Sequence, residues 1–187
     1  MSKFISDELI PLNAAVMTIS DTRNDDTDTS GQLLSELITL AGHNFVEKRI
    51  VKDDIYQIRA HLSQWIADET TQVVVLTGGT GFTDRDSTPE AVHPLLDKEV
   101  LGFGELFRQV SFDQIGSSTI QSRALAGLSN GTLIFCLPGS NNACKTGWNQ
   151  LIKPQIDSRH KPCNFVAQLK NTTEPECLSR ESTEGTV

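Results

Sequence analysis

Residues 73–91 read VVVLTGGTGFTDRDSTPEA and join an apolar run to the start of a helix through a glycine-rich loop. The apolar run is typical of a strand in the centre of a parallel sheet, where both faces are buried. The glycines allow backbone N–H groups to turn inward around an anion, and a carboxylate such as Asp86 could hold a metal against that anion. The segment therefore predicts a binding site for a phosphorylated ligand with Mg²⁺.

A simpler explanation exists for the three glycines of this loop. Gly78, Gly79 and Gly81 would also be expected in a tight turn that requires positive φ. A turn alone, however, does not require so many flanking oxygen atoms, and these favour the binding interpretation. The oxygen-bearing residues are Thr77, Thr80, Thr83, Asp84, Asp86, Ser87 and Thr88.

Apolar periodicity outside the loop alternates between strand and helix patterns. Strands are expected at residues 14–20, 45–51, 73–77 and 132–138, and helices at 30–41, 55–66, 89–96, 101–112 and 141–152. Ser30 is expected to cap the first helix, Asp54 and Gln57 have capping-box spacing, and Gly42 is a plausible C-terminal stop. Parallel strands need crossover connections, so this order predicts an α/β fold whose sheet is covered on both faces.

Ligands of such folds collect at the carboxyl ends of the strands. Ser20, Thr77 and Pro138 all lie at expected strand ends, so their loops should converge on one cleft. Some neighbouring residues have two interpretations. Asp21 suits either an Asx-turn or a ligand contact, and Thr88 suits either a helix cap or a phosphate contact. Asp53 is either a capping residue or a functional carboxylate, because Asp54 already satisfies the cap spacing.

Composition limits the class of protein. The 187 residues are 37% hydrophobic, which suits one globular domain. A net charge of −8 argues against general affinity for nucleic acid or anionic membranes, so any phosphate must be held locally. The four cysteines form no CxxC pair, no apolar stretch approaches the roughly 20 residues of a membrane span, and the start lacks a signal-peptide core. A cytoplasmic location is expected.

The chain is expected to divide into three parts. Residues 1–12 form an N-terminal extension, residues 13–166 the α/β domain, and residues 167–187 an acidic C-terminal tail that should be disordered. Within the domain, the aromatic-rich helix at 101–112 belongs either to the ordinary core or to a subunit contact.

Other nucleotide and metal motifs match poorly. Asp84 stands where a dinucleotide fingerprint needs its third glycine, and Cys144 stands at the second glycine of a P-loop read from Gly139 to Thr146. A nucleotide-binding switch on that second segment remains an alternative, which predicts ATP or GTP binding that is lost in Lys145→Ala. The four histidines show no zinc-ligand spacing.

Several segments together closely resemble one known family. They are residues 76–91, Ser20-Asp21, Val51-Lys52-Asp53, Gly102-Phe103-Gly104-Glu105, Gln121-Ser122-Arg123 and Leu137-Pro138-Gly139-Ser140. In this combination they resemble the molybdenum cofactor biosynthesis protein B family, a close relative of the molybdopterin adenylyltransferases of the MogA type. The similarity runs from about residue 14 to residue 165, and the TGGTG run followed by D-x-T-P-E-A is highly specific.

The resemblance implies a three-layer α/β/α sandwich with a mostly parallel central sheet, assembled as a trimer or a dimer of trimers in the cytosol. It implies binding of molybdopterin and transfer of AMP from Mg-ATP to its terminal phosphate. Asp53 and Asp86 then correspond to the catalytic, Mg²⁺-binding carboxylates. The implied substrate-binding residues are Ser20, Asp21, Thr77, Gly78, Gly79, Thr80, Gly81, Thr88, Glu90, Pro138, Gly139 and Ser140.

The loop after the last expected strand departs from the pattern of many adenylyltransferases. It reads Pro138-Gly139-Ser140-Asn141-Asn142 and lacks a second proline, so it should be less rigid. Two functions remain open. The first is an adenylyltransferase that acts before metal insertion, with other proteins of the pathway as possible partners. The second is a noncatalytic oligomer that stores or hands over molybdopterin.

Overall fold

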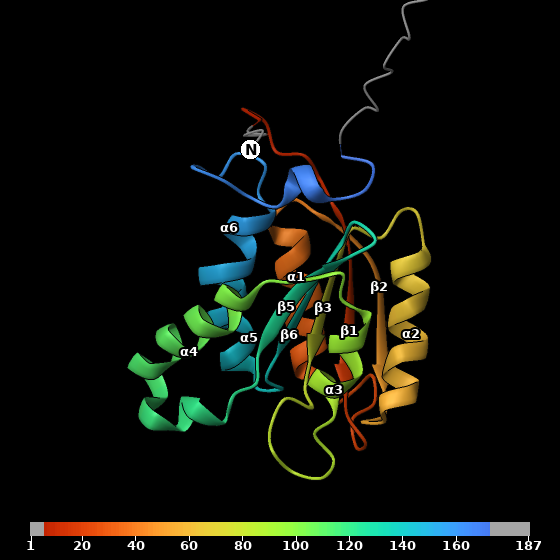
Figure 1. Ribbon diagram of the computed structural model, residues 1–187, viewed down its shortest axis with the longest axis vertical. Coiled ribbons are helices and arrows are strands. Elements are labelled where there is room, and N and C mark those ends of the chain that lie inside the picture. Colours follow the sequence, from red (N-terminus) through yellow and green to blue (C-terminus); the bar gives the residue numbers. More distant parts are fainter. Residues whose placement is uncertain (1–5, 173–187) are drawn as a thin grey trace, which may run out of the picture.

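The computed structural model describes residues 6–172 and contains one six-stranded sheet with the order β2-β1-β3-β6-β5-β4 (Figure 1). The first four of these strands are parallel, and β5 runs antiparallel to both of its neighbours. The strands are β1 (Asn13–Ile19), β2 (Asn44–Val51), β3 (Val73–Thr77), β4 (Lys98–Glu99), β5 (Leu125–Ser129) and β6 (Thr132–Leu137). The expected α/β fold with a mostly parallel sheet is confirmed.

Helices cover both faces of the sheet and form the two outer layers of the sandwich (Figure 1). One face carries α1 (Thr29–Leu40), α4 (Leu101–Ile115), α5 (Asn141–Gly147) and α6 (Lys153–Ile156), with the π-helical turn η3 (Trp148–Ile152) between the last two. The other face carries α2 (Ile55–Ala67) and α3 (Thr88–Val92). Short 3₁₀ helices are η1 (His93–Leu95), η2 (Gly116–Gln121) and η4 (Val166–Gln168).

Alternate residues of each central strand supply two separate cores. In β3, Val73 and Val75 pack with Leu34, Phe107 and Trp148 from the helices on the first face. Val74 and Leu76 pack on the opposite face against α2 and α3. All five residues of β3 are buried, which explains why this strand reads as an uninterrupted apolar run.

Two strands were missing from the sequence prediction. β5 and β6 form a hairpin whose turn residues, Asn130 and Gly131, have φ of 48° and 70°. Asn-Gly between two strands is a strong hairpin signal, because both turn positions need positive φ. The other missing strand, β4, spans only Lys98 and Glu99 and pairs with β5, and a segment this short carries no usable periodicity.

The prediction that Ser30 caps the first helix is wrong. Asp28 is the N-cap of α1, and its carboxylate accepts a hydrogen bond from the amide of Gly31. Thr29 and Ser30 are therefore already inside the first turn. The cap predicted for α2 is confirmed, since Asp54 accepts from the amides of Tyr56 and Gln57.

The expected helix at 141–152 divides into α5 and η3, and the helical segment continues past its expected end as α6. Pro154 has no N–H group and its ring conflicts with a regular α-helical turn, and a π-turn accommodates such a residue. Leu12 and Leu169, just outside the expected domain limits, are both buried in the core of the first face. The expected tail lies outside the described residues from 173 onward. No helix among residues 6–172 is long and apolar enough to cross a membrane.

Candidate functional site

The carboxyl ends of three neighbouring strands build the centre of the site. Thr77 of β3 lies in register between Thr18 of β1 and Leu137 of β6. Directly after β3, the amide of Gly78 donates to the carbonyl of Leu137 at 3.0 Å. The loops that follow β1, β3 and β6 therefore meet at one edge of the sheet, as the sequence predicted.

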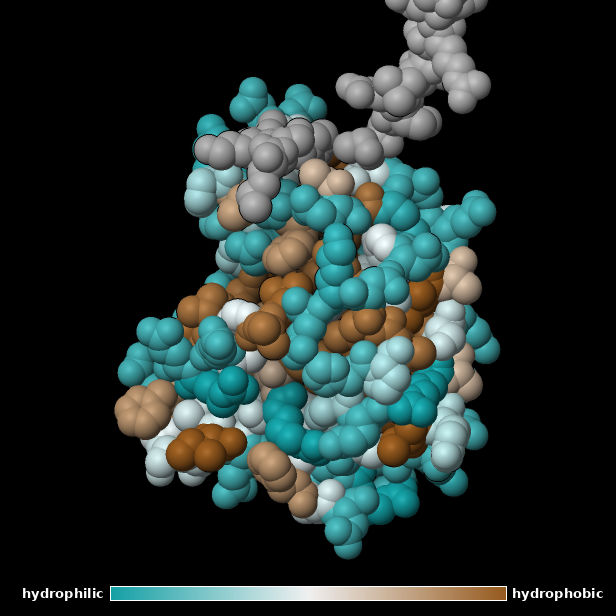
Figure 2. Space-filling model, viewed as in Figure 1, coloured by the Kyte–Doolittle hydropathy of each residue, from teal (hydrophilic) through white to brown (hydrophobic). Residues whose placement is uncertain are grey.

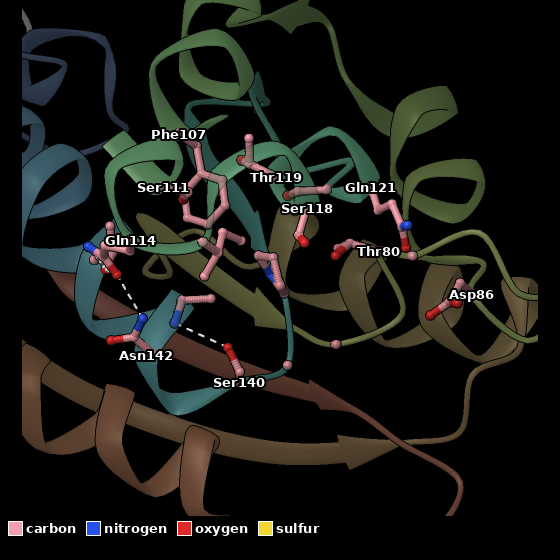
Figure 3. A pocket seen from close by; sticks show the side chains of 18 of the residues that line it. Thr80, Asp86, Phe107, Ser111, Gln114, Ser118, Thr119, Gln121, Ser140 and Asn142 are labelled. Atoms are coloured by element: carbon pink, nitrogen blue, oxygen red, sulfur yellow. Dashed lines mark hydrogen bonds between the residues drawn. The ribbon is translucent and has the colours of Figure 1, made fainter. Parts of the chain in front are cut away.

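A pocket of about 440 Å³ opens at this edge (Figure 3). One wall is the glycine loop, a second is the segment from Pro138 into α5, and the third is formed by α4 and η2. Asp86 is the charged member of its described lining, and the remaining polar groups are hydroxyls and amides. The lining consists of Gly78, Gly79, Thr80, Gly81, Asp86, Phe107, Ser111, Gln114, Ile115, Ser118, Thr119, Gln121, Ser122, Pro138, Gly139, Ser140, Asn142, Ala143 and Thr146.

The third wall is the part of the pocket that sequence reasoning missed. Ser111 and Gln114 are three residues apart and lie on one side of α4, and Ser118 follows in η2 after the turn at Gly116. All three face the pocket in Figure 3. Gln114 donates to Thr146 at 3.0 Å and accepts from Asn142 at 2.7 Å, which ties α4 to α5. The signal available in the sequence was the pair of polar residues Ser111 and Gln114, one helical turn apart, on the side of the helix that also carries the buried Phe107.

The second wall does not work as a P-loop would. Ser140 caps α5 by accepting from the amide of Ala143 at 3.2 Å. Lys145, the residue on which a nucleotide switch would depend, is exposed and does not line the pocket. Cys144 is buried behind this wall, where loss of hydration raises the pKa of its thiol to about 11.

Gly79 allows a carboxylate to approach the loop backbone closely. Its φ is +61°, and a Cβ at this position would lie 2.5 Å from Oδ2 of Asp53 and 2.4 Å from Oγ1 of Thr88. No side chain fits there without displacing one of those oxygen atoms. Gly79 is therefore needed for the close contact between the loop and Asp53, which lies two residues after the end of β2.

Asp53 is bound to the far end of the glycine loop. Its Oδ1 accepts from the amide of Ser87 at 3.0 Å and from the hydroxyl of the same residue at 2.5 Å. Asp53 therefore lies beside the residue that follows Asp86, although it does not line the pocket. The two aspartates predicted from sequence are brought to the same loop from positions 33 residues apart in the numbering.

Asp86 is held in its ionised form by the loop itself. Its Oδ2 accepts from the hydroxyl of Thr83 at 2.7 Å and from the amide of the same residue at 2.9 Å. Burial acts to raise the pKa of Asp86, but these hydrogen bonds, one from the amide of Gly81 and the charge of Arg123 outweigh it and hold the pKa below its ordinary value. The carboxylate is negatively charged at neutral pH.

Asp21 and Ser20 take local structural positions outside the pocket. Asp21 forms a two-pronged ion pair with Arg85, at 3.0 Å to Nε and 2.7 Å to the terminal nitrogen, and also accepts from the amide of Asp53 at 3.3 Å. Ser20 accepts from the amides of Thr22 and Arg23. The loop after β1 is thus fastened to the tip of the glycine loop.

The remaining predicted site residues lie behind or beside the pocket. Thr77 is buried and donates to the carbonyl of Pro138 at 3.2 Å. Thr88 is also buried and donates to the carbonyl of Gly78 at 2.9 Å. Glu90 is exposed and pairs with Arg123. Their side chains shape the loop, while Thr80, Gly81 and Ser140 contribute directly to the lining.

Arg123 joins the third wall to the glycine loop, a role that sequence reasoning did not assign. Its guanidinium donates to the carbonyls of Gly81 and Asp86, both at 2.8 Å, and forms an ion pair with Glu90. It also lies over the ring of Phe82, 5.1 Å from the centroid. One side chain thereby holds both ends of the loop that carries Asp86.

A second hollow of about 650 Å³ lies next to the loop after β2. Its lining includes Lys52, Arg85 and the carboxylate of Asp54, with His61 and Gln57 from α2 beside them. The charge of Arg85 is already paired with Asp21. Arg85 belongs to the same loop as Asp86, and Lys52 precedes Asp53. Segments that carry the two aspartates therefore also contribute to this hollow, while Asp86 itself lines the pocket.

The donor set fits Mg²⁺ better than zinc. Residues 6–172 contain no group of three or more His, Cys, Asp or Glu side chains that could hold a metal ion by themselves. Mg²⁺ usually takes one or two protein carboxylates and completes its coordination with phosphate oxygens and water. Asp53 and Asp86 supply that number of carboxylates, and both come from segments next to a predicted phosphate-binding loop.

Fold and site together define an α/β protein with a glycine loop and a polar pocket at the carboxyl edge of its sheet. A family model described as "Probable molybdopterin binding domain" matches residues 5–158. Molybdenum cofactor biosynthesis protein B of Escherichia coli (strain K12) is 53% identical over 166 residues, which cover 89% of this chain and 98% of that protein. The chain therefore belongs to the molybdopterin-binding family and is a molybdenum cofactor biosynthesis protein.

Solved structures agree with this assignment. A crystal structure of molybdenum cofactor biosynthesis protein B has a TM-score of 0.76 and 46% identity, and the match covers 79% of this chain and 92% of that one. The tungsten cofactor synthesizing protein MoaB from Pyrococcus furiosus has a TM-score of 0.71 and 38% identity, with coverage of 78% and 92%.

Proposed function

We propose that the protein binds molybdopterin in the 440 Å³ pocket and transfers AMP from Mg-ATP to its terminal phosphate. The observation that carries the proposal is the position of Asp53 and Asp86, which the contact of Asp53 with Ser87 brings to one loop, next to both the polar pocket and the hollow that Lys52 lines. Hydroxyls and amides of the pocket suit the hydrogen-bonding edge of a pterin. Lys52 suits the phosphates of ATP, whereas Arg85 is already paired with Asp21.

The reaction needs alignment more than proton transfer. An oxygen of the terminal phosphate of molybdopterin attacks the α-phosphorus of ATP, the new P–O bond forms, and the bond to the bridging oxygen breaks so that pyrophosphate leaves. Asp53 and Asp86 would hold the Mg²⁺, which supplies neutralisation of phosphate charge when bound. The amides of Gly79 and Thr80 would orient the attacking phosphate, because those of Gly78 and Gly81 already donate to Leu137 and Asp86.

An assay for adenylylated product tests this function. Purified protein is mixed with molybdopterin, ATP and Mg²⁺, and adenylylated molybdopterin and pyrophosphate are measured. We expect Asp53→Asn and Asp86→Asn each to lower kcat by about 10²-fold or more, because each removes charge at the position of the metal. Glu69→Gln, which neutralises an exposed carboxylate between α2 and β3 at the opposite end of the strand, is the control. Normal turnover by both Asp53→Asn and Asp86→Asn would refute the assignment of these two residues.

A noncatalytic role is the second candidate, and one observation favours it. Asp53 does not line the pocket, and one of its oxygens is already occupied by Ser87. A protein that only stores or hands over molybdopterin would need the pocket but not this carboxylate. Tight binding of molybdopterin without any ATP-dependent product would support this candidate, and absence of binding would contradict both.

We also propose that a second copy of the chain covers the exposed side of α4 and η2. Hydrophobic side chains gather over this part of the molecule in Figure 2, where Leu101, Leu106, Phe112, Ile115 and Ile120 are exposed. A groove beside them contains Phe82 together with charges of both signs, Glu105 and Arg108 among them. A trimer or hexamer would bury this apolar surface.

A further inference from the structure

A buried carboxylate behind the second pocket wall has no part in the proposed chemistry. The side chain of Asp28 has no exposed surface. Its Oδ2 accepts from the hydroxyl of Thr18 at 2.9 Å, and its Oδ1 accepts from the amide of Gly31 at 2.9 Å. A Cβ on Gly31 would lie 2.2 Å from Oδ2, so the chain leaves room for this group.

Two cations accompany this carboxylate. Nζ of Lys48 lies 3.3 Å from Oδ2 of Asp28, and a terminal nitrogen of Arg23 lies 3.5 Å from Oδ1. A buried charge is costly unless it is paired and hydrogen-bonded, so one cation already has a clear structural duty. Two cations are more than the pairing of a single carboxylate requires, and their remaining contacts differ.

Arg23 extends from the buried carboxylate to the pocket. One terminal nitrogen contacts Asp28 and donates to the hydroxyl of Ser30, and the other donates to the carbonyl of Gly139 at 3.2 Å. Lys48, in contrast, forms its second ion pair with the exposed Asp25. Because a guanidinium is planar, holding one of its nitrogens determines where the other points.

The carbonyl that Arg23 contacts belongs to a glycine, whose backbone is not restricted by a side chain. Gly139 and Ser140 line the pocket and precede α5, without the second proline that would restrict their backbone. Thr77 holds the carbonyl of Pro138 from the strand side. The carbonyl of the next residue, Gly139, accepts the hydrogen bond from Arg23. This bond joins the loop after β1 to the loop after β6.

We propose that Arg23 is a positioning residue, which uses the buried Asp28 as an anchor to hold the carbonyl of Gly139 and so maintain the second wall of the pocket. Its effect on ligand binding rests on the proposed binding of molybdopterin. Its effect on the loop does not, because the contacts belong to the protein without ligand.

Three variants separate positioning from charge pairing. Arg23→Lys keeps a cation beside Asp28 but has no planar fork to reach Gly139 as well. Lys48→Gln removes one cation from the same carboxylate without touching the pocket wall. Arg23→Gln removes both the cation beside Asp28 and the hydrogen bond to the carbonyl of Gly139. For each full-length variant, the measurements are thermal unfolding, hydrogen exchange of the ligand-free protein, and the Kd for molybdopterin.

Hydrogen exchange is followed at the amides of Ala143 and Cys144, which donate to the hydroxyl and the carbonyl of Ser140. For Arg23→Lys we expect a near-native unfolding temperature, exchange at these amides about tenfold faster and a Kd about tenfold higher, a change of about 1.4 kcal/mol. For Lys48→Gln we expect a lower unfolding temperature with exchange and Kd unchanged.

Native exchange and Kd in Arg23→Lys would overturn the inference, as would an equal loss of binding in Lys48→Gln. Failure of the wild-type protein to bind molybdopterin would overturn the proposed function instead. In that case the exchange rates alone decide whether Arg23 positions the wall. Faster exchange in both Arg23 variants but not in Lys48→Gln supports it, and equal rates in all three refute it.

Discussion

At the scale of single residues, the site depends on how closely Asp53 approaches Gly79. Gly79 has φ of +61°, and a Cβ on it would lie 2.5 Å from Oδ2 of Asp53. We expect Gly79→Ala to lose about 1–2 kcal/mol of stability from the backbone conformation alone. We also expect the displaced carboxylate to lower adenylyl transfer strongly. Chemical denaturation and the product assay measure the two effects.

Gly102→Ala is the matched control for this prediction. Gly102 lies in the first turn of α4 with a normal φ, and a Cβ there would meet nothing within 4 Å. Alanine is the better helix former by about 0.5–1 kcal/mol, so this variant should be as stable as the wild-type protein or more so. Equal behaviour of the two variants would show that Gly79 is not required for the approach of Asp53.

The sequence identified the groups that carry chemistry better than the groups that hold them. Asp53, Asp86 and the glycines could be selected because their residue types and spacing are unusual. Arg23 and Arg123 could not be, since each acts through contacts to backbone carbonyls far along the chain, at Gly139 and Gly81. Such contacts depend on the tertiary fold and leave no local pattern.

At the scale of elements, Arg123 fastens the third pocket wall to the glycine loop by bonds to Gly81, Asp86 and Glu90. A lysine has one ammonium group and no planar fork, so it cannot make these contacts together. We expect Arg123→Lys to raise the Kd for molybdopterin about tenfold, equivalent to about 1.4 kcal/mol, because the loop loses its defined position. Titration of pterin fluorescence measures the change.

Arg49 provides a control of similar local structure. It pairs with Glu47 and lies 4.8 Å from the centroid of the Trp65 ring, on the β2 and α2 side of the molecule. Arg49→Lys should lower the free energy of unfolding about as much as Arg123→Lys does, without changing the Kd for molybdopterin. An equal rise of Kd in both variants would mean that the effect of Arg123 is general destabilisation.

Elements with strong patterns were predicted well, and those that depend on pairing were not. β1, β3 and β6 are long apolar runs, and α1 and α2 have clear helical periodicity. The edge of the sheet formed by β5 and β4 was missed because β4 has two residues and β5 is stabilised by its partner. The N-cap of α1 was placed two residues late, because Asp28 and Ser30 are both good capping residues and only the buried contacts of Asp28 distinguish them.

At the scale of the whole molecule, the exposed apolar surface on α4 and η2 predicts self-association. Ile120 is 73% exposed, and in an oligomer we expect it to be covered. Ile120→Lys should therefore shift the mass measured by sedimentation towards the monomer, because it places a charge within an apolar contact. Leu40→Lys is the control, since Leu40 is 83% exposed at the end of α1 and outside this surface. Identical masses for the two variants would contradict the proposed interface.

Stability should also depend on pH through His43, which is buried beside the start of β1. Burial lowers its pKa from the ordinary 6.5, an effect that Asp157 opposes and Arg159 supports. Nδ1 accepts a hydrogen bond from the amide of Leu12 at 3.2 Å, so the neutral ring is the native form.

Because the pKa of His43 is lower in the folded state, the unfolded chain binds more protons in the range between the two pKa values. The free energy of unfolding should be fully retained above the unfolded value of 6.5 and should fall as the pH drops from there through the folded pKa. The pKa values of Asp86 and Asp157 are lowered from 3.8, so their contribution is lost in a separate, more acidic range. In His43→Asn, whose amide oxygen can still accept from Leu12, urea unfolding should show a smaller decline between about pH 6.5 and 5. A decline as steep as that of the wild-type protein would assign the pH dependence to other groups.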